Sequence, residues 1–288
     1  MTMYLIPLLA GLMISCAQSE AQSQEAATEH IRKVFPVARA GASVLVIYNI
    51  NGLINVEGST DDTVTFDVDK RITSDDKQAL AKGKQELKLA FEQKGDTVMA
   101  YIVEPFDSRP NRNNRGDRDD RRIHYDFTLD FTVKIPRGMN VNVSTVNRGD
   151  VRVKDVAGAL WVRNVNGAIA LTNARGATDV HTVNGNIDAN YLDNPPDKSS
   201  YYTLNGNIRV SYPPSLSADM RFKTFQGEFY TDFTEAEILP VQVVKNQERE
   251  GDKTVYKLNK TTAVRVGTGG KTLRFETFNG NVYIKKQS

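Results

Sequence analysis

The chain repeats one short turn signature seven times: an apolar residue, a side-chain amide, and then glycine. The corner residues are Asn51 and Gly52, Asn147 and Gly149, Asn166 and Gly167, Asn184 and Gly185, Asn205 and Gly206, Gln226 and Gly227, and Asn279 and Gly280. Glycine has no Cβ and asparagine tolerates positive φ, so this pair favours tight turns between extended segments. Each signature therefore predicts a corner between two strands.

A second regularity has a period of nine residues and concerns the apolar residues between the corners. Two registers repeat: Val151, Leu160, Ile169, Thr178 and Ile187, and then, two residues later in each case, Val153, Val162, Leu171, Val180 and Ala189. Residues two apart in a strand share a face, so both registers point inward, and the intervening Arg152, Trp161, Ala170, Asp179 and Asp188 point outward.

These two periods predict an all-β fold, a single-chain β-solenoid of about 18 to 21 residues per coil in which each strand pairs with its equivalent one coil along. The glycines at 149, 167, 185 and 206 recur at this interval. A flat sandwich of ordinary hairpins is the alternative. It accounts for the alternation of apolar and polar residues but not for the nine-residue spacing.

The first residues are typical of a targeting segment. Residues 1–17 are expected to be a signal peptide, because the apolar stretch from Tyr4 to Ile14 is too short to span a bilayer. Cys16, the only cysteine, follows Met13, Ile14 and Ser15 in a stretch that resembles the lipobox of bacterial lipoproteins, and this resemblance makes Cys16 the candidate lipidation site. Ordinary cleavage after Ala17 is the alternative. The chain is thus expected to be exported, to the outer membrane or periplasm as a lipoprotein or otherwise secreted, touching the membrane only through such an anchor.

The remaining chain divides into a tether and one domain. Residues 18–40 are expected to form a flexible tether, and residues 41–288 the repeating domain. Within it, Leu80, Leu87 and Phe91 lie near helical spacing and predict one amphipathic helix over about 74–93, capped by Ser74 or Asp75. Residues 107–122, rich in arginine and aspartate without a large apolar residue, predict a disordered loop.

Charge and side-chain chemistry exclude several classes of function. With 37 basic and 35 acidic residues, the formal charge of +2 argues against nucleic-acid binding. The three histidines, His30, His124 and His181, are far apart in sequence, so we expect no metal site and no cofactor. The carboxylates are scattered; Asp188 and Glu228 are expected two coils apart in different registers, so no catalytic residue is expected.

The corner motifs resemble a known family. Ser144-Thr145-Val146-Asn147, Asn164-Val165-Asn166-Gly167, Thr182-Val183-Asn184-Gly185, Thr203-Leu204-Asn205-Gly206 and Thr277-Phe278-Asn279-Gly280 are similar to the Thr-x-Asn-Gly repeats of bacterial "putative adhesin" domains of unknown function. The resemblance covers residues 43 to 286 and implies a β-solenoid, with Arg148 inserted at one corner as a bulge.

The export segment and this resemblance together predict a non-enzymatic cell-envelope protein. Its expected partner is an envelope protein or a surface polymer. A polysaccharide-acting enzyme with an outer groove and a scaffold or sensor in an envelope-stress system are the alternatives.

Overall fold

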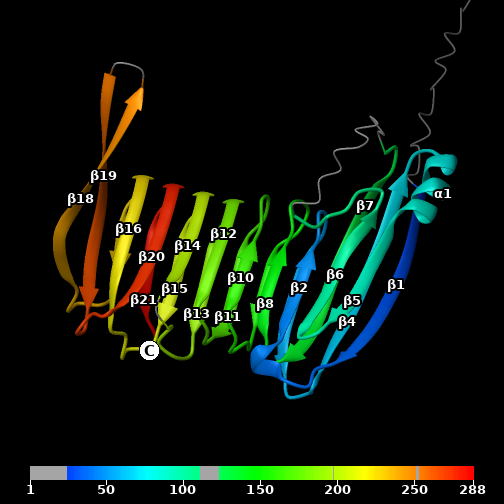
Figure 1. Ribbon diagram of the computed structural model, residues 1–288, viewed down its shortest axis with the longest axis horizontal. Helices are drawn as coiled ribbons and strands as arrows, with labels where there is room; N and C mark the ends of the chain where they lie inside the picture. The colour runs from blue at the N-terminus through cyan, green and yellow to red at the C-terminus, as the bar shows by residue number, and fades with distance from the viewer. Residues whose placement is uncertain (1–24, 111–122, 197, 251–252) are drawn as a thin grey trace, which may run out of the picture.

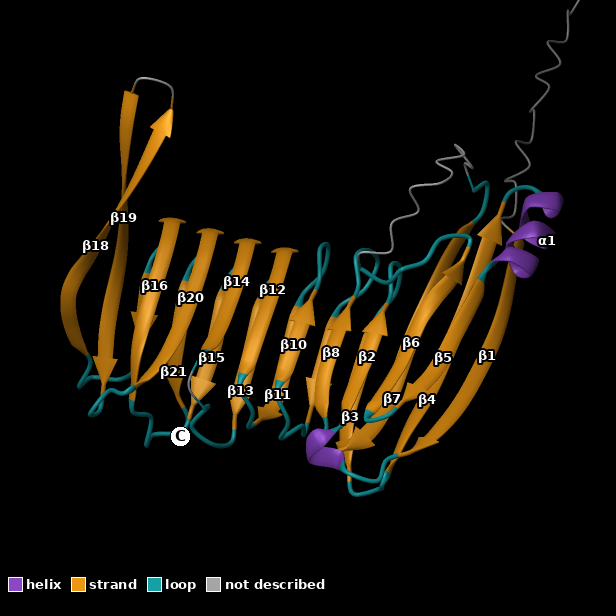
Figure 2. Cartoon of the chain, in the orientation of Figure 1, coloured by secondary structure: helices purple, strands orange, loops and turns teal. Residues whose placement is uncertain are grey.

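The computed structural model describes residues 25–110, 123–196, 198–250 and 253–288, with the backbone alone over 241–250 and 253–261. The chain forms two large sheets that both extend along the long axis of the molecule, one in front of the other in this view (Figure 1, Figure 2). The prediction of an all-β fold is confirmed. Both sheets are open: β1 and β17 are the end strands of one, which we call sheet A, and β18 and β5 those of the other, sheet B.

The order of the strands across each sheet differs from their order along the chain. Across sheet A the strands are β1 (Glu25–Pro36), β4 (Thr63–Ser74), β7 (Asp126–Pro136), β3 (Ile54–Ser59), β9 (Val151–Lys154), β11 (Ile169–Ala174), β13 (Ile187–Tyr191), β15 (Ile208–Tyr212), β21 (Val282–Lys286) and β17 (Phe229–Thr231). Across sheet B they are β18 (Glu237–Glu250), β19 (Lys253–Val266), β16 (Ala218–Gln226), β20 (Lys271–Asn279), β14 (Ser199–Asn205), β12 (Thr178–Asn184), β10 (Leu160–Arg163), β8 (Asn140–Ser144), β2 (Val44–Tyr48), β6 (Thr97–Glu104) and β5 (Lys88–Lys94).

The nine-residue period corresponds to an alternation between the two sheets. Consecutive strands β9 to β13 lie in sheets A, B, A, B and A. Each pairs in parallel with its equivalent one coil along, so that Ile169 lies opposite Ile187, and Ile187 lies opposite Ile208. The inward registers are buried, as expected, with Val151, Leu160 and Ile169 at most 1% exposed. The core is a column of such side chains between the sheets.

The last coils do not follow the order of the sequence. β20 and β21, the final strands of the chain, insert between the β14–β15 coil and the β16–β17 coil (Figure 1). The chain therefore passes one coil position, forms β16 and β17 beyond it, adds the β18–β19 hairpin to sheet B, and returns to fill the gap. The last corner in space is therefore the one between β16 and β17, with Phe225 and Tyr230 on its two sides, and not the corner nearest the C-terminus.

The helix is shorter than the sequence predicts. α1 spans Lys77–Glu86 and is capped by Asp76, whose carboxylate accepts from the backbone N–H of Gln78 at 2.9 Å. The expected helix over 74–93 is therefore wrong at both ends, and so is the expected cap at Ser74 or Asp75. From Lys88 the chain forms β5, which pairs with β6 across a turn at Gly95. Leu87 and Phe91, which are four residues apart as on one face of a helix, also fit a period of two, and pairing with β6 selects the strand.

The expected tether also ends earlier than predicted. Glu25–Pro36 forms the twelve-residue strand β1, which pairs antiparallel with β4, and Ala40–Ala42 forms a short 3₁₀ helix. The expected signal peptide, Cys16 and residues 111–122 of the expected loop lie outside the described residues. No helix in the described ranges is long and apolar enough to cross a membrane.

Candidate functional site

The corner glycines form a column in which each lies against the backbone of the preceding coil. A Cβ built on Gly185 would lie 2.1 Å from the carbonyl oxygen of Gly167, and one on Gly206 would lie 2.0 Å from that of Gly185. In space the column runs Gly52, Gly149, Gly167, Gly185, Gly206, Gly280 and Gly227. Only Gly52 and Gly280 among these seven have positive φ. The expectation that positive φ selects these glycines is therefore wrong for most of them, because close approach between coils is what excludes a side chain.

The residue two before each corner amide binds the same column of carbonyls. Thr203 Oγ1 donates to the Gly185 oxygen at 2.9 Å, and Thr182 Oγ1 donates to the Gly167 oxygen at 2.9 Å. Thr145 and Thr277 make the same bond, to Gly52 and Gly206, at 3.0 Å. Where asparagine stands in place of threonine, its side-chain amide makes the equivalent hydrogen bond: Asn164 Nδ2 donates to the Gly149 oxygen at 3.0 Å. These bonds explain the first position of the Thr-x-Asn-Gly motif.

The corner asparagines form a ladder along the outside of the same edge. Nδ2 of each donates to Oδ1 of its neighbour, from Asn166 to Asn147, Asn184 to Asn166 and Asn205 to Asn184 at 2.8 Å, and from Asn279 to Asn205 at 2.7 Å. One N–H and one oxygen lone pair per residue are used within the ladder. The second amide hydrogen and the other lone pair of each internal member thus face solvent at one strand spacing, about 4.8 Å.

The residues directly before the corner amides, at position x of the Thr-x-Asn-Gly motif, form an apolar row beside this ladder, on the outer face of sheet B. We call it the apolar row; its members are Val146, Val165, Val183, Leu204, Phe278 and Phe225, whereas Ile50, the equivalent residue of the first corner, packs against the core. Its two phenylalanines are its most exposed members, Phe225 at 71% and Phe278 at 43%. Their rings stack with centroids 4.6 Å apart and an interplanar angle of 9°. The sequence places an apolar residue before every corner amide, but the sequence alone does not show which of these residues share the outer face.

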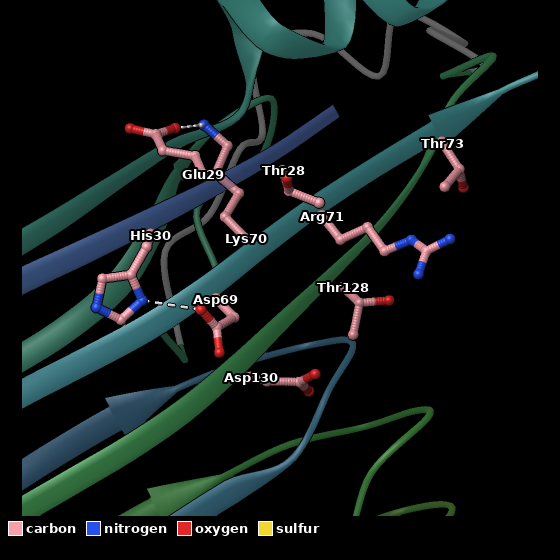
Figure 3. Close-up of a pocket in the computed structure, with 9 residues that line it drawn as sticks. All are labelled: Thr28, Glu29, His30, Asp69, Lys70, Arg71, Thr73, Thr128 and Asp130. Atoms are coloured by element: carbon pink, nitrogen blue, oxygen red, sulfur yellow. Dashed lines mark hydrogen bonds and ion pairs between the residues drawn. The ribbon is translucent and has the colours of Figure 1, made fainter. Parts of the chain in front are cut away.

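A polar groove of about 610 Å³ lies across β1, β4 and β7, at the end of sheet A opposite to β17 (Figure 3). His30 Nδ1 lies 2.8 Å from Asp69 Oδ1, and Asp69 is the cross-strand neighbour of Asp130. Arg71 extends alongside Thr128 and Thr73 in Figure 3. The hydrogen bond to Asp69 raises the pKa of His30 above its usual value, because it favours the imidazolium.

The candidate catalytic and metal-binding side chains do not converge. Asp188 pairs with Arg209 at 3.4 Å, and Glu228 accepts a hydrogen bond from Tyr230. Since β21 is inserted, their strands β13 and β17 are three steps apart, about 14 Å and not the expected two coils. This exceeds the separation of about 10 Å or less between paired glycosidase carboxylates. Within the described ranges, no three His, Cys, Asp or Glu residues could share a metal ion.

The histidines lie as isolated side chains on outer surfaces. His30 is in the polar groove, His124 is exposed before β7, and His181 lies 3.1 Å from Asp179 on sheet B, with its ring beside Tyr202. Burial, followed by the nearby charge of Arg163, lowers the pKa of His181. It is therefore mostly neutral at pH 7.

Sequence reasoning missed a chain of buried tyrosine hydroxyls in the core. Tyr191 donates to Thr178 Oγ1 at 2.5 Å, Tyr201 donates to Tyr191 at 2.6 Å, and Tyr212 donates to Tyr201 at 3.3 Å. All three rings are fully buried. Tyr191, Tyr201 and Tyr212 alternate with outward residues, so the period of two signalled burial but not the contact among the hydroxyls.

Comparison with known proteins gives only distant similarities. No family model and no curated protein matches the chain. It is similar to the structure of a putative cell adhesion protein from Clostridium sporogenes, with 11% identity and a TM-score of 0.41, over 90% of this chain and 100% of the other. A putative adhesin from Bacteroides fragilis (11%, TM-score 0.38) and a putative lipid binding protein from Parabacteroides distasonis (10%, TM-score 0.30) each match over 90% of this chain and 97% of their own. Two of these three structures are thus described as adhesion proteins or adhesins. At such identities and TM-scores, their names assign no ligand to this chain.

Proposed function

We propose that this chain is an exported, non-enzymatic protein of the bacterial cell envelope that binds an envelope polymer or envelope protein through its corner edge. The corner edge consists of the apolar row and the asparagine ladder beside it. In this proposal the repeated coils form a β-solenoid whose role is to present that edge. The expected signal peptide and Cys16 would carry the protein across the membrane and hold it there.

The apolar row is the observation that carries the proposal. Its members occupy the solvent side of sheet B, where a strand with one buried face ordinarily carries polar residues. Neighbouring positions on that face do so, for example Arg163 and Asp179, which form an ion pair at 2.8 Å. A continuous apolar row on a water-exposed face is typical of an interaction surface.

The parallel pairing supports a rigid edge. Equivalent residues recur at intervals of 18 and 21 along the chain, and both the threonine bonds and the asparagine ladder connect each coil to the next. A partner that lies along the edge would meet the same groups at every coil without ordering any loop, which lowers the entropic cost of binding.

The test compares binding of the mature protein to isolated cell envelopes. The double substitution Val183→Ser and Leu204→Ser interrupts the apolar row and is expected to weaken binding at least tenfold. Leu192→Ser is the matched control, because Leu192 is also exposed, at 44%, but follows β13 outside the corner edge. Equal loss in the control, or no envelope binding by the unsubstituted protein, would contradict the proposal.

The anchor is tested separately. Labelled palmitate should be incorporated into the full-length protein and lost in Cys16→Ala. Retained labelling in the variant would exclude Cys16 as the lipidated residue, and a protein found in the cytoplasm with residues 1–17 intact would contradict export.

A further inference from the structure

The terminal corner of the molecule carries two aromatic pairs, one on each side of the turn. Phe225, at the end of β16, stacks on Phe278, and Tyr230, in β17, stacks on Tyr283 with centroids 5.1 Å apart and an angle of 8°. The turn between them is Gln226-Gly227-Glu228. Because β20 and β21 are inserted one coil earlier, Phe225 is the last residue of the apolar row and Tyr230 lies on the end strand of sheet A.

Each terminal ring has one stacked face and one open face. β17 is the end strand of sheet A, so no described strand lies beyond Tyr230, which is 45% exposed. On the other side of the turn, the pairing of β16 with β19 stops at Phe222, three residues before Phe225. The corner therefore exposes two aromatic faces separated by one tight turn, an arrangement that a soluble protein rarely leaves uncovered.

Polar groups surround the two rings. The Gln226 side chain is exposed and lies opposite Asn279, one strand beyond the last member of the asparagine ladder. The Glu228 carboxylate accepts from the Tyr230 hydroxyl, and Asn281 Nδ2 donates to the Tyr283 hydroxyl at 3.0 Å. Amide and carboxylate groups beside an aromatic face can form hydrogen bonds with the hydroxyl groups of a sugar ring, while the aromatic face packs against the C–H groups of that ring.

The charge at this corner distinguishes among the ligands that could pack on the rings and form hydrogen bonds with the polar groups beside them. Residues 225–230 contain one carboxylate and no lysine or arginine. Lys223 is paired with Glu276 at 2.5 Å and Arg209 with Asp188 at 3.4 Å. Lys285, two residues after Tyr283 in β21, is an exposed cation close to this corner, and the segment from Phe225 to Asp232 carries two carboxylates, those of Glu228 and Asp232. The corner therefore has no excess of positive charge that would attract an acidic polymer, and an acyl chain would have to bury the polar groups that flank the rings.

We infer that the terminal corner is a binding site for an uncharged glycan chain, whose sugar rings pack on the open faces of Phe225 and Tyr230 and whose hydroxyl groups bond Gln226 and Glu228. This inference rests on the proposed function and specifies the polymer. The rest of the glycan would continue along the asparagine ladder, where each internal amide offers one donor and one acceptor per coil.

The experiment measures binding of the mature protein to soluble glycans by calorimetry, with β-glucan, xylan, mannan and chitin oligosaccharides as uncharged probes and polygalacturonate as the anionic probe. At least one uncharged glycan is expected to bind, and polygalacturonate is not. Phe225→Ala and Tyr230→Ala should each weaken binding at least tenfold. Tyr230→Phe keeps the ring and should lower affinity by less than threefold.

Control variants separate loss of the site from loss of the fold. Val34→Ala removes an exposed apolar side chain of β1, at the opposite end of sheet A, and should leave glycan affinity unchanged. Phe225→Leu keeps apolar volume without the ring, and should bind as weakly as Phe225→Ala while melting at the temperature of the unsubstituted protein.

Three outcomes would overturn the inference: preference for polygalacturonate, no binding of any uncharged glycan, or full affinity in Phe225→Leu and Tyr230→Ala. If glycans fail to bind while cell-envelope binding remains sensitive to Val183→Ser and Leu204→Ser, the glycan inference is wrong and the proposed function stands. Loss of all envelope binding in the unsubstituted protein would instead contradict the proposed function.

Discussion

Thr203 Oγ1 donates a hydrogen bond of 2.9 Å to the carbonyl oxygen of Gly185, one coil away. Gly185 belongs to one corner motif and Thr203 to the next, so this bond joins two copies of the repeat. The same glycine excludes a Cβ, because its neighbour Gly167 lies directly against it. One motif therefore provides a close backbone approach and a donor for the adjacent carbonyl, which is how a four-residue signature holds the coils in register.

Replacement of this donor should lower stability. Thr203→Val keeps the shape but leaves the Gly185 carbonyl without its side-chain donor in a part-buried position, so we expect a loss of about 1–2 kcal/mol in the free energy of unfolding. Thr203→Ser retains the hydroxyl and should lose less. Urea unfolding of the two variants measures the difference, and equal stability of Thr203→Val and the unsubstituted protein would exclude this role for the bond.

The reason for glycine at the corners can be tested by three alanine substitutions. Gly185→Ala places a Cβ 2.1 Å from a backbone oxygen and should cost about 1–3 kcal/mol. Gly95→Ala tests positive φ alone, because its φ is 58° and no atom lies within 4 Å of the added Cβ; about 1 kcal/mol is expected. Gly41→Ala, which has neither constraint, should be close to neutral. Thermal unfolding should rank the three in this order, and a neutral Gly185→Ala would refute the close approach.

The coil period could be predicted from the sequence because it depends on local signals. Alternation of apolar residues and recurrence of Asn-Gly are both visible within one repeat, and they placed Val151, Ile169 and Ile187 correctly on the inner face. The chemistry of the corner could not be predicted in the same way. The collision that excludes a side chain at Gly185 is with Gly167, eighteen residues away, and becomes apparent only once the coils are stacked.

The order of the last coils and the strand β1 were missed for different physical reasons. No local pattern says that β20 and β21 insert before β16 and β17, since every strand there has the same alternation. β1 was missed because it buries little apolar surface. Ile31 and Phe35 are partly buried against the core, and the rest of the strand is held by cross-strand hydrogen bonds and by ion pairs such as Arg32 with Asp67 at 3.1 Å, which leave no hydrophobic signature. The open aromatic corner depends on that insertion and was missed with it.

The buried tyrosine chain should make the protein sensitive to alkali. Burial raises the pKa of Tyr191 to about 12, whereas an unfolded tyrosine ionises near 10. The folded state thus holds the proton more tightly, and its stabilising effect is complete below about pH 10 and is lost as the pH rises to about 12. Tyr191→Phe should reduce this pH dependence. At neutral pH it should also cost about 1–3 kcal/mol, because Tyr201 loses its acceptor.

The control for this prediction is Tyr202→Phe. Tyr202 lies on the outer face of the same strand as Tyr201, and its hydroxyl bonds no residue in the described part of the chain. Denaturant unfolding at pH 7 and at pH 11 should separate the two variants. If Tyr191→Phe were as stable as the unsubstituted protein at pH 7, the chain of tyrosine hydroxyls would contribute nothing to the free energy of unfolding.

Docking of β1 should weaken as the pH rises through the pKa of His30. His30 faces Asp69 at 2.8 Å and Asp67 at 3.5 Å, with Asp130 one strand further, and its hydrogen bond to Asp69 raises its pKa. A group whose pKa is raised on folding stabilises the folded state fully below the unfolded value and ceases to do so above the folded value. The melting temperature should therefore exceed that of His30→Gln at about pH 5.5, below the unfolded pKa, and the difference should be smaller at about pH 8. Val34→Ala changes an exposed apolar side chain of the same strand and no charge, so its difference from the unsubstituted protein should be the same at both pH values. A difference for His30→Gln that is also constant with pH would exclude His30 as the titrating contact between β1 and β4.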